Sequence, residues 1–135
     1  MGYLKNEHGD FSTVVNARSL SHRIWGSWNK ETASSFKTAI KQQANDLQGS
    51  PWGMVADIRD WELCTPEVFD YFDEALVYCI DHDLCCQAAV VNIRIQEVLA
   101  KSHYGRVFPS LKSDSFSAYD DAKAWCLQQI KEYSA

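Results

Sequence analysis

Three carboxylates that lie close together are the residues best suited to chemistry. Asp57, Asp60 and Glu62 follow an apolar run typical of a buried strand and precede a predicted helix start. Ligands of α/β proteins tend to bind where strands end, and a carboxylate pair there could act as general acid and base or hold a divalent cation. Against an enzymatic site, acidic residues are common in such loops, and no glycine-rich phosphate-binding loop accompanies them.

The same segment contains a thiol and a hydroxyl that could react or be modified. Cys64 stands just before the predicted helix, whose dipole favours a thiolate, so it is the best candidate for a nucleophile. No Cys-x-x-Cys motif or suitably spaced histidine supports this role, and a lone cysteine is more often a small apolar side chain in a core. Thr65 is predicted to cap the helix, with the hydroxyl that a regulatory phosphorylation would use.

A second group, His82, Cys85 and Cys86, has ligand types that suit zinc. Adjacent cysteines in a strand point to opposite faces, so we predict structural thiols and no metal site. The chain has five cysteines, an odd number, and is long enough to be stabilised by core burial. We therefore expect free thiols and a cytoplasmic protein, and the sequence gives no reason to assign a cofactor.

Trp61 is one of five tryptophans and lies among charged residues. We expect this stretch to be a loop and Trp61 to be partly exposed, lining a pocket or a protein contact. The alternative is that Trp61 covers an edge of the core. Trp125, by contrast, falls on an apolar helical stripe and is predicted to be in the core.

Hydrophobic periodicity predicts the elements that position these residues. Strands are expected over residues 11–20, 23–28, 54–58, 86–93 and 107–108. Helices are expected after four capping residues, with the third helix short and closed by Gly105; the caps are Asn29, Thr65, Asn92 and Ser117. This order predicts an α/β fold with one mixed β-sheet, which has an antiparallel opening hairpin and a parallel centre and is packed with helices.

We expect one domain over residues 1–135, because no linker, repeat or low-complexity segment interrupts the pattern. Six apolar residues are predicted to share one core: Phe36, Ile40, Val55, Phe72, Leu76 and Val90. The net charge of -5 and the lack of a basic tract argue against nucleic acid as a partner. No apolar run approaches the ~20 residues of a membrane span, and no secretory signal is visible at the N-terminus.

This element order, with a strand reading Ile24-Trp25-Gly26-Ser27-Trp28 before the first long helix, resembles the STAS-like superfamily. That superfamily includes anti-sigma-factor antagonists and the cytosolic domains of sulfate transporters. In the antagonists an Asp-Ser-Ser-Gly motif opens the helix after the third strand and carries a regulatory phosphoserine.

The antagonist motif is absent from this chain. Only Thr65 stands near the phosphoacceptor position, and Pro66 and Glu67 depart from the Ser-Gly of the family. A phosphorylation switch is therefore not carried over by the resemblance. The sequence looks more similar to the small stand-alone branch of the superfamily, which is related to Sec14-type lipid-binding domains.

The leading functional hypothesis is a non-enzymatic binding or regulatory module that uses the surface at the start of the second long helix. Its partner would be another protein or a second copy in a homodimer. The first alternative is a carrier or sensor of a small apolar ligand or lipid, and a weaker one is an enzyme that uses the loop from Asp57 to Cys64. No catalytic residue is assigned, and the predicted binding residues are Asp57, Asp60, Trp61, Cys64 and Thr65.

Overall fold

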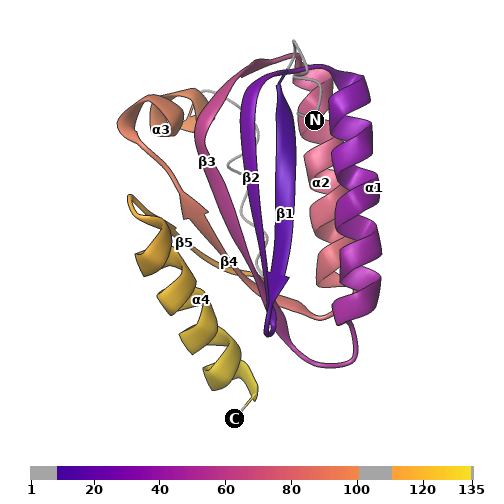
Figure 1. Ribbon diagram of the computed structural model, residues 1–135, viewed down its shortest axis with the longest axis vertical. Coiled ribbons are helices and arrows are strands. Elements are labelled where there is room, and N and C mark those ends of the chain that lie inside the picture. The colour runs from indigo at the N-terminus through magenta and orange to yellow at the C-terminus, as the bar shows by residue number, and fades with distance from the viewer. Residues whose placement is uncertain (1–8, 101–110, 135) are drawn as a thin grey trace, which may run out of the picture.

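A computed structural model describes residues 9–100 and 111–134 of the chain (Figure 1). Five strands and four helices are found in these residues. In chain order they are β1 (Asp10–Asn16), β2 (Ser19–Trp28), α1 (Lys30–Leu47), β3 (Trp52–Cys64), α2 (Pro66–Ile80), β4 (Leu84–Val90), α3 (Ile93–Ala100), β5 (Lys112–Phe116) and α4 (Tyr119–Ser134).

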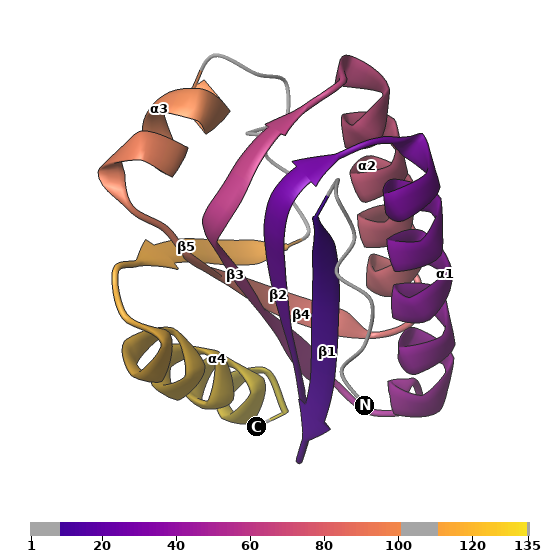
Figure 2. The ribbon, with the colours of Figure 1, turned by 45° about the horizontal axis from the view of Figure 1, so that its top comes forward.

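The strands form a single mixed sheet in the order β1-β2-β3-β4-β5. The pair β1–β2 is antiparallel and every other pair is parallel, which confirms the predicted α/β architecture. Helices α1 and α2 lie side by side on one face of the sheet, and α4 lies on the opposite face (Figures 1 and 2). Among the described helices, none is long and apolar enough to cross a membrane.

The opening hairpin turns earlier than predicted. A single strand over residues 11–20 is wrong, because the chain reverses at Ala17, whose φ of 55° is left-handed, and at Arg18. The Arg18 guanidinium donates to the carbonyls of Leu47, Ser50 and, at 3.3 Å, Pro51. These distant contacts hold a turn whose two central residues, Ala17 and Arg18, are not typical turn formers, so the local sequence gives only a weak turn signal.

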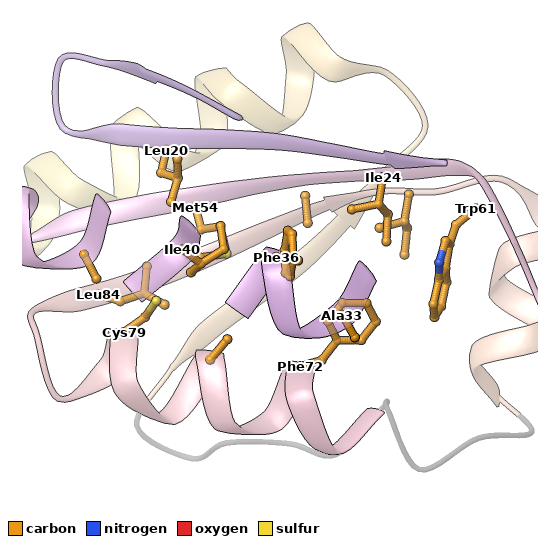
Figure 3. Close-up of a cluster of buried hydrophobic side chains, with 14 of the residues drawn as sticks. Leu20, Ile24, Ala33, Phe36, Ile40, Met54, Trp61, Phe72, Cys79 and Leu84 are labelled. Carbon is orange, nitrogen blue, oxygen red and sulfur yellow. The ribbon is translucent and has the colours of Figure 1, made fainter. Parts of the chain in front are cut away.

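Two hydrophobic layers lie on opposite faces of the sheet, so the prediction of a single core is wrong. Val55 and Val90 pack against α4, together with Cys126 and Ile130. The larger layer lies between the sheet and the helices α1 and α2 (Figure 3). Of the residues predicted for one core, it contains Phe36, Ile40 and Phe72, with Leu76 half-buried at its margin.

Two of the predicted helix caps are confirmed by side-chain hydrogen bonds. Asn29 Oδ1 accepts from the backbone N–H of Thr32 at 3.0 Å, and Asn92 Oδ1 accepts from the N–H of Ile95 at 2.9 Å. The predicted cap at Ser117 is wrong, because α4 begins only at Tyr119. The apolar side chains of α1 recur every three or four residues and are buried, namely Ala33, Phe36, Ile40, Ala44 and Leu47.

The C-terminal part of the sheet differs from expectation. The predicted strand at residues 107–108 and the helix end at Gly105 lie outside the described residues. The described edge strand is β5, whose residues Lys112 to Ser115 are exposed and polar. A strand with one apolar residue, Phe116, has no hydrophobic alternation by which to recognise it. Trp125, predicted to be core, is half-buried against Phe116 instead.

Candidate functional site

The segment predicted as a loop after Ile58 is a continuation of β3. The strand runs to Cys64, well past the last residue paired with β4, because β2 continues to pair with it. The register against β2 shifts between Arg23 and Trp25, so that Trp25 pairs with Asp60. All five predicted site residues therefore lie on one strand and at the helix start that follows it.

The two aspartates of this segment are each bound by an arginine. Arg59 donates to Asp57 twice, from Nε to Oδ1 at 3.0 Å and from Nη2 to Oδ2 at 2.8 Å. Burial tends to raise the pKa of Asp57, but the hydrogen bonds and charge of Arg59 outweigh it and hold the pKa below its usual value. Arg23 Nη2 lies 2.7 Å from Asp60 Oδ2 in an exposed ion pair. A carboxylate held ionised in this way is a weak general base, so the geometry does not favour acid–base chemistry.

Cys64 is not the activated thiol that its position suggested. Its side chain packs against the larger hydrophobic layer, and burial raises its pKa to about 11. The loss of hydration outweighs any favourable effect of the α2 dipole, so the thiol stays protonated near neutral pH. The structure therefore agrees with the alternative favoured from the sequence, a small apolar side chain packed against a core.

Trp61 is buried, at 1% exposure, so the expectation of partial exposure is wrong. Its ring packs edge-on against three other aromatic rings, those of Trp28, Phe69 and Phe72, at centroid distances of 6.4, 5.8 and 5.4 Å. The exposed neighbours Asp60 and Glu62 alternate with it as they do in a half-buried strand. This alternation was the sequence signal that the loop interpretation missed.

Thr65 occupies the predicted N-cap position of α2, but its side chain makes no capping hydrogen bond. The backbone is extended there, and Pro66 begins the helix as expected. The exposed Thr65 hydroxyl lies 3.3 Å from Glu67 Oε1 instead. The side chain thus lies at the surface and accepts no hydrogen bond from the backbone N–H groups of the first turn of the helix.

Replacing Thr65 is therefore expected to have little effect on stability. Thr65→Ala should change the free energy of unfolding by less than about 0.5 kcal/mol, because there is no cap bond to lose. Thr65→Asp should leave stability unchanged or raise it by up to about 1 kcal/mol, since aspartate caps well and its charge suits a helix N-terminus. Urea denaturation of both variants tests this. A loss above about 1.5 kcal/mol in Thr65→Ala would show that the hydroxyl does cap α2.

Exposed acidic residues lie on both sides of Thr65 in the chain, within five positions of it. We use the name β3–α2 surface for the exposed residues Asp60, Glu62, Thr65, Glu67 and Asp70. Four of these five carry carboxylates, and only Asp60 has a described arginine partner. The surface is therefore negatively charged and is held on a paired strand and the first turn of a helix.

No protein-family model and no curated protein matches the chain. Solved structures do match. An uncharacterised DUF3478-family protein with a SpoIIAA-like fold from Shewanella loihica has a TM-score of 0.68 at 12% identity, over 92% of this chain and 99% of that chain. An anti-sigma factor antagonist from Mycobacterium paratuberculosis has a TM-score of 0.62 at 16% identity, over 92% and 99%. The phosphorylated form of the Bacillus cell fate determinant SpoIIAA has a TM-score of 0.55 at 10% identity, over 85% and 97%.

The chain has a STAS-like fold. The resemblance inferred from the order of its elements is thereby confirmed, and at these identities the likeness shows the fold alone. In this STAS-like chain Thr65 is the single residue between the end of β3 and the start of α2.

The residues considered for zinc do not assemble in the STAS-like fold. His82 Nδ1 lies 2.7 Å from the carbonyl of Tyr78, on whose ring it stacks. Cys86 is buried with its Sγ 3.7 Å from that of Cys126, and all five cysteines are free thiols. Within the described part of the chain, no three histidine, cysteine or acidic side chains are placed to hold a metal ion.

A buried histidine in β2 escaped the sequence analysis. His22 lines a cavity of about 20 Å³ between the sheet and the helices α1 and α2, and its Nδ1 has no hydrogen-bond partner in the described structure. The inward-facing series Leu20, His22 and Ile24 follows the period of two that reveals such a position. The cavity has room for about one water molecule and is far too small for a lipid.

Proposed function

We propose that this chain is a non-enzymatic regulatory module that binds a protein partner through the β3–α2 surface. The observation that carries the proposal is the set of four exposed carboxylates within five positions of Thr65 in the chain. These side chains stand on a paired strand and a helix start, so binding would cost little backbone ordering. The similar structure from Mycobacterium paratuberculosis is that of an anti-sigma factor antagonist, which supports the same class of function for this chain.

The chemistry of the segment supports a binding role over catalysis. Asp57 is ionised and bidentately bound by Arg59, and the Cys64 thiol has a raised pKa. Neither group is prepared to abstract a proton or to attack a substrate. The cavity at His22 is likewise too small to hold a lipid between the sheet and the helices α1 and α2.

Charge determines which protein would bind this surface. A surface with four carboxylates attracts a partner that presents lysine or arginine, and such attraction accelerates association. Two copies of the same acidic surface would repel each other across a two-fold axis. We therefore favour a basic protein partner over a homodimer formed through this surface.

Charge reversal at Glu62 tests the proposal. Tagged wild-type protein and Glu62→Lys should be used to recover partners from the native host at low salt. A partner bound through the β3–α2 surface should be recovered at least about 10-fold less well with Glu62→Lys, because a favourable contact becomes a repulsive one. Glu62 is exposed, so the melting temperature should stay near that of wild type.

Asp46→Lys is the matched control. Asp46 is exposed near the C-terminal end of α1, at the opposite end of the helical layer from the β3–α2 surface. The change in net charge is the same, so partner recovery should equal that of wild type. Equal recovery with Glu62→Lys and wild type, or equal loss with both variants, would contradict a specific role for this surface.

A further inference from the structure

A second site lies at the C-terminal ends of β4 and β5. A cleft of about 600 Å³ opens there between the start of α3, the end of β5 and the β3 residue Arg59. In Figure 2, α3 and α4 stand on either side of the arrowhead of β5. Clefts of this volume, at the carboxyl ends of parallel strands, are the usual place for small ligands in α/β folds.

The charge of the cleft is opposite to that of the protein. Among the side chains that the structure describes, its lining includes Arg59 and Arg94 and no acidic residue, in a chain with a net charge of -5. Asp57 neutralises Arg59 through its bidentate bond, whereas Arg94 has no ion-pair partner among the described side chains and supplies the positive charge. The hydroxyls of Ser115 and Ser117 and the amide side chains of Asn92 and Gln96 add neutral hydrogen-bonding groups to the lining.

Both arginines are held in position before any ligand arrives. Arg94 Nη2 donates to the carbonyls of Trp61 at 2.7 Å and Arg59 at 3.2 Å. Asn92 Nδ2 donates to the same carbonyl of Arg59 at 3.0 Å, which ties the start of α3 to β3. These bonds use a minority of the five N–H donors of Arg94 and reduce the ordering that a ligand would require.

The cleft also offers apolar contact. Ile93 is 75% exposed, the largest exposure among the exposed large hydrophobic residues of the described chain. Phe116, from the end of β5, lines the cleft with it. A cationic group next to exposed apolar surface matches a molecule that has an anionic end and an apolar end.

We propose that this cleft binds a small organic anion, in which a carboxylate or phosphate group meets Arg94 and an apolar group contacts Ile93 and Phe116. The ligand class is set by these side chains and does not depend on the proposed protein partner. The site is also separate from the β3–α2 surface, with which its lining shares no residue.

Binding of two probes, phenyl phosphate and benzoate, tests the proposal and distinguishes a phosphate from a carboxylate ligand. Titrations of ¹⁵N-labelled protein, followed by NMR, should show saturable shifts at residues of α3 and the end of β5 with at least one probe. Inorganic phosphate has only the anionic group that the proposal requires, and benzyl alcohol has only the apolar group. Each should bind at least about 10-fold more weakly than the better probe, the equivalent of 1.4 kcal/mol.

Ser117→Asp supplies the variant for this test. It places a carboxylate at the cleft, and because Ser117 is exposed just before α4, the fold should be retained. Binding of the better probe should weaken at least about 10-fold. Ser50→Asp makes the same charge change in an exposed loop at the opposite ends of the parallel strands and should bind like wild type.

Three results would overturn the proposal: no saturable binding of either probe, undiminished binding by Ser117→Asp, or equal weakening by Ser50→Asp. Arg94→Gln provides a second variant should Ser117→Asp prove poorly folded. It removes the charge and keeps a donor for the carbonyl of Trp61, so the same loss of binding is expected. Benzyl alcohol binding as tightly as the anions would equally contradict a role for Arg94.

Discussion

Trp61→Ala is expected to destabilise the protein by about 3 to 5 kcal/mol, the cost of removing a large buried aromatic side chain. The ring is at 1% exposure and connects β3 to the aromatic residues of β2 and α2. A loss of this size is a large part of the stability of a small domain, so the variant should be largely unfolded at modest urea concentrations. Urea denaturation followed by far-UV circular dichroism measures it.

Two control variants show whether the loss of stability comes from removing a buried ring or from removing any tryptophan. Trp61→Phe should cost much less than Trp61→Ala, because the ring contacts are largely kept and a buried Nε1 without a described partner is removed. Trp25→Ala should cost only about 1 kcal/mol, since Trp25 is half-buried and its ring lies 5.1 Å from the guanidinium carbon of Arg23. Similar losses in the free energy of unfolding for Trp61→Ala and Trp25→Ala would show that Trp61 is not buried among the aromatic rings of β2 and α2.

Because Trp61 is buried, its variants are unsuitable for testing the β3–α2 surface. A variant of Trp61 would weaken protein binding by unfolding the chain, whatever the role of the surface. Glu62, its exposed neighbour in β3, changes the surface without touching the core. Alternation along a single strand therefore separates the stabilising residue from the residue that a partner would meet.

The second large effect is a loss of stability in acid that depends on His22. Desolvation lowers the pKa of His22 to about 4, and the charge of Asp57 only partly opposes this. The unfolded chain binds a proton near pH 6.5, whereas the folded protein does so only near pH 4. Stability is therefore full above about pH 6.5 and declines as the pH falls to about 4. A pKa shift of this size corresponds to a loss of roughly 3 kcal/mol in the free energy of unfolding once the pH is at or below about 4.

His22→Gln tests this assignment, because glutamine is neutral throughout the range. The free energy of unfolding of wild type should fall between pH 7 and pH 4, while that of His22→Gln should stay nearly flat. The stability that Asp57 contributes through its lowered pKa is lost as the pH falls through and below its ordinary value of 3.8, so most of that loss lies below the range in which His22 acts. An identical decline in both proteins above pH 4 would show that other groups bind the proton.

Local patterns were sufficient to predict the sheet type and the main helices. The stripe of α1, its cap at Asn29, the start of α2 at Pro66 and the buried strand through Val55 each depend on residues within one or two turns or on one short run. Periodicity, capping and proline act over such distances, so they can be interpreted without knowing the fold. The order of these elements then predicted the mixed sheet.

The candidate site was predicted by position but not by environment. The segment from Asp57 to Thr65 does lie at the end of a buried strand and the start of a helix. Whether a carboxylate there is available depends on Arg23, which is 37 residues from Asp60 in the chain. Whether Trp61 is exposed depends on β2 pairing with β3 past the last contact with β4.

The sequence by itself therefore determined the sheet type, the main helices and where polar residues gather, because these follow from interactions between near neighbours. Only the tertiary structure decided which face each strand presents, that the apolar residues form two layers, and that Arg94 and Ser117 line one cleft. The physical reason is that register shifts and long-range pairs are set by the packing of whole elements. A bulge of one residue reverses the direction of every side chain that follows it, and the local pattern does not record where that bulge occurs.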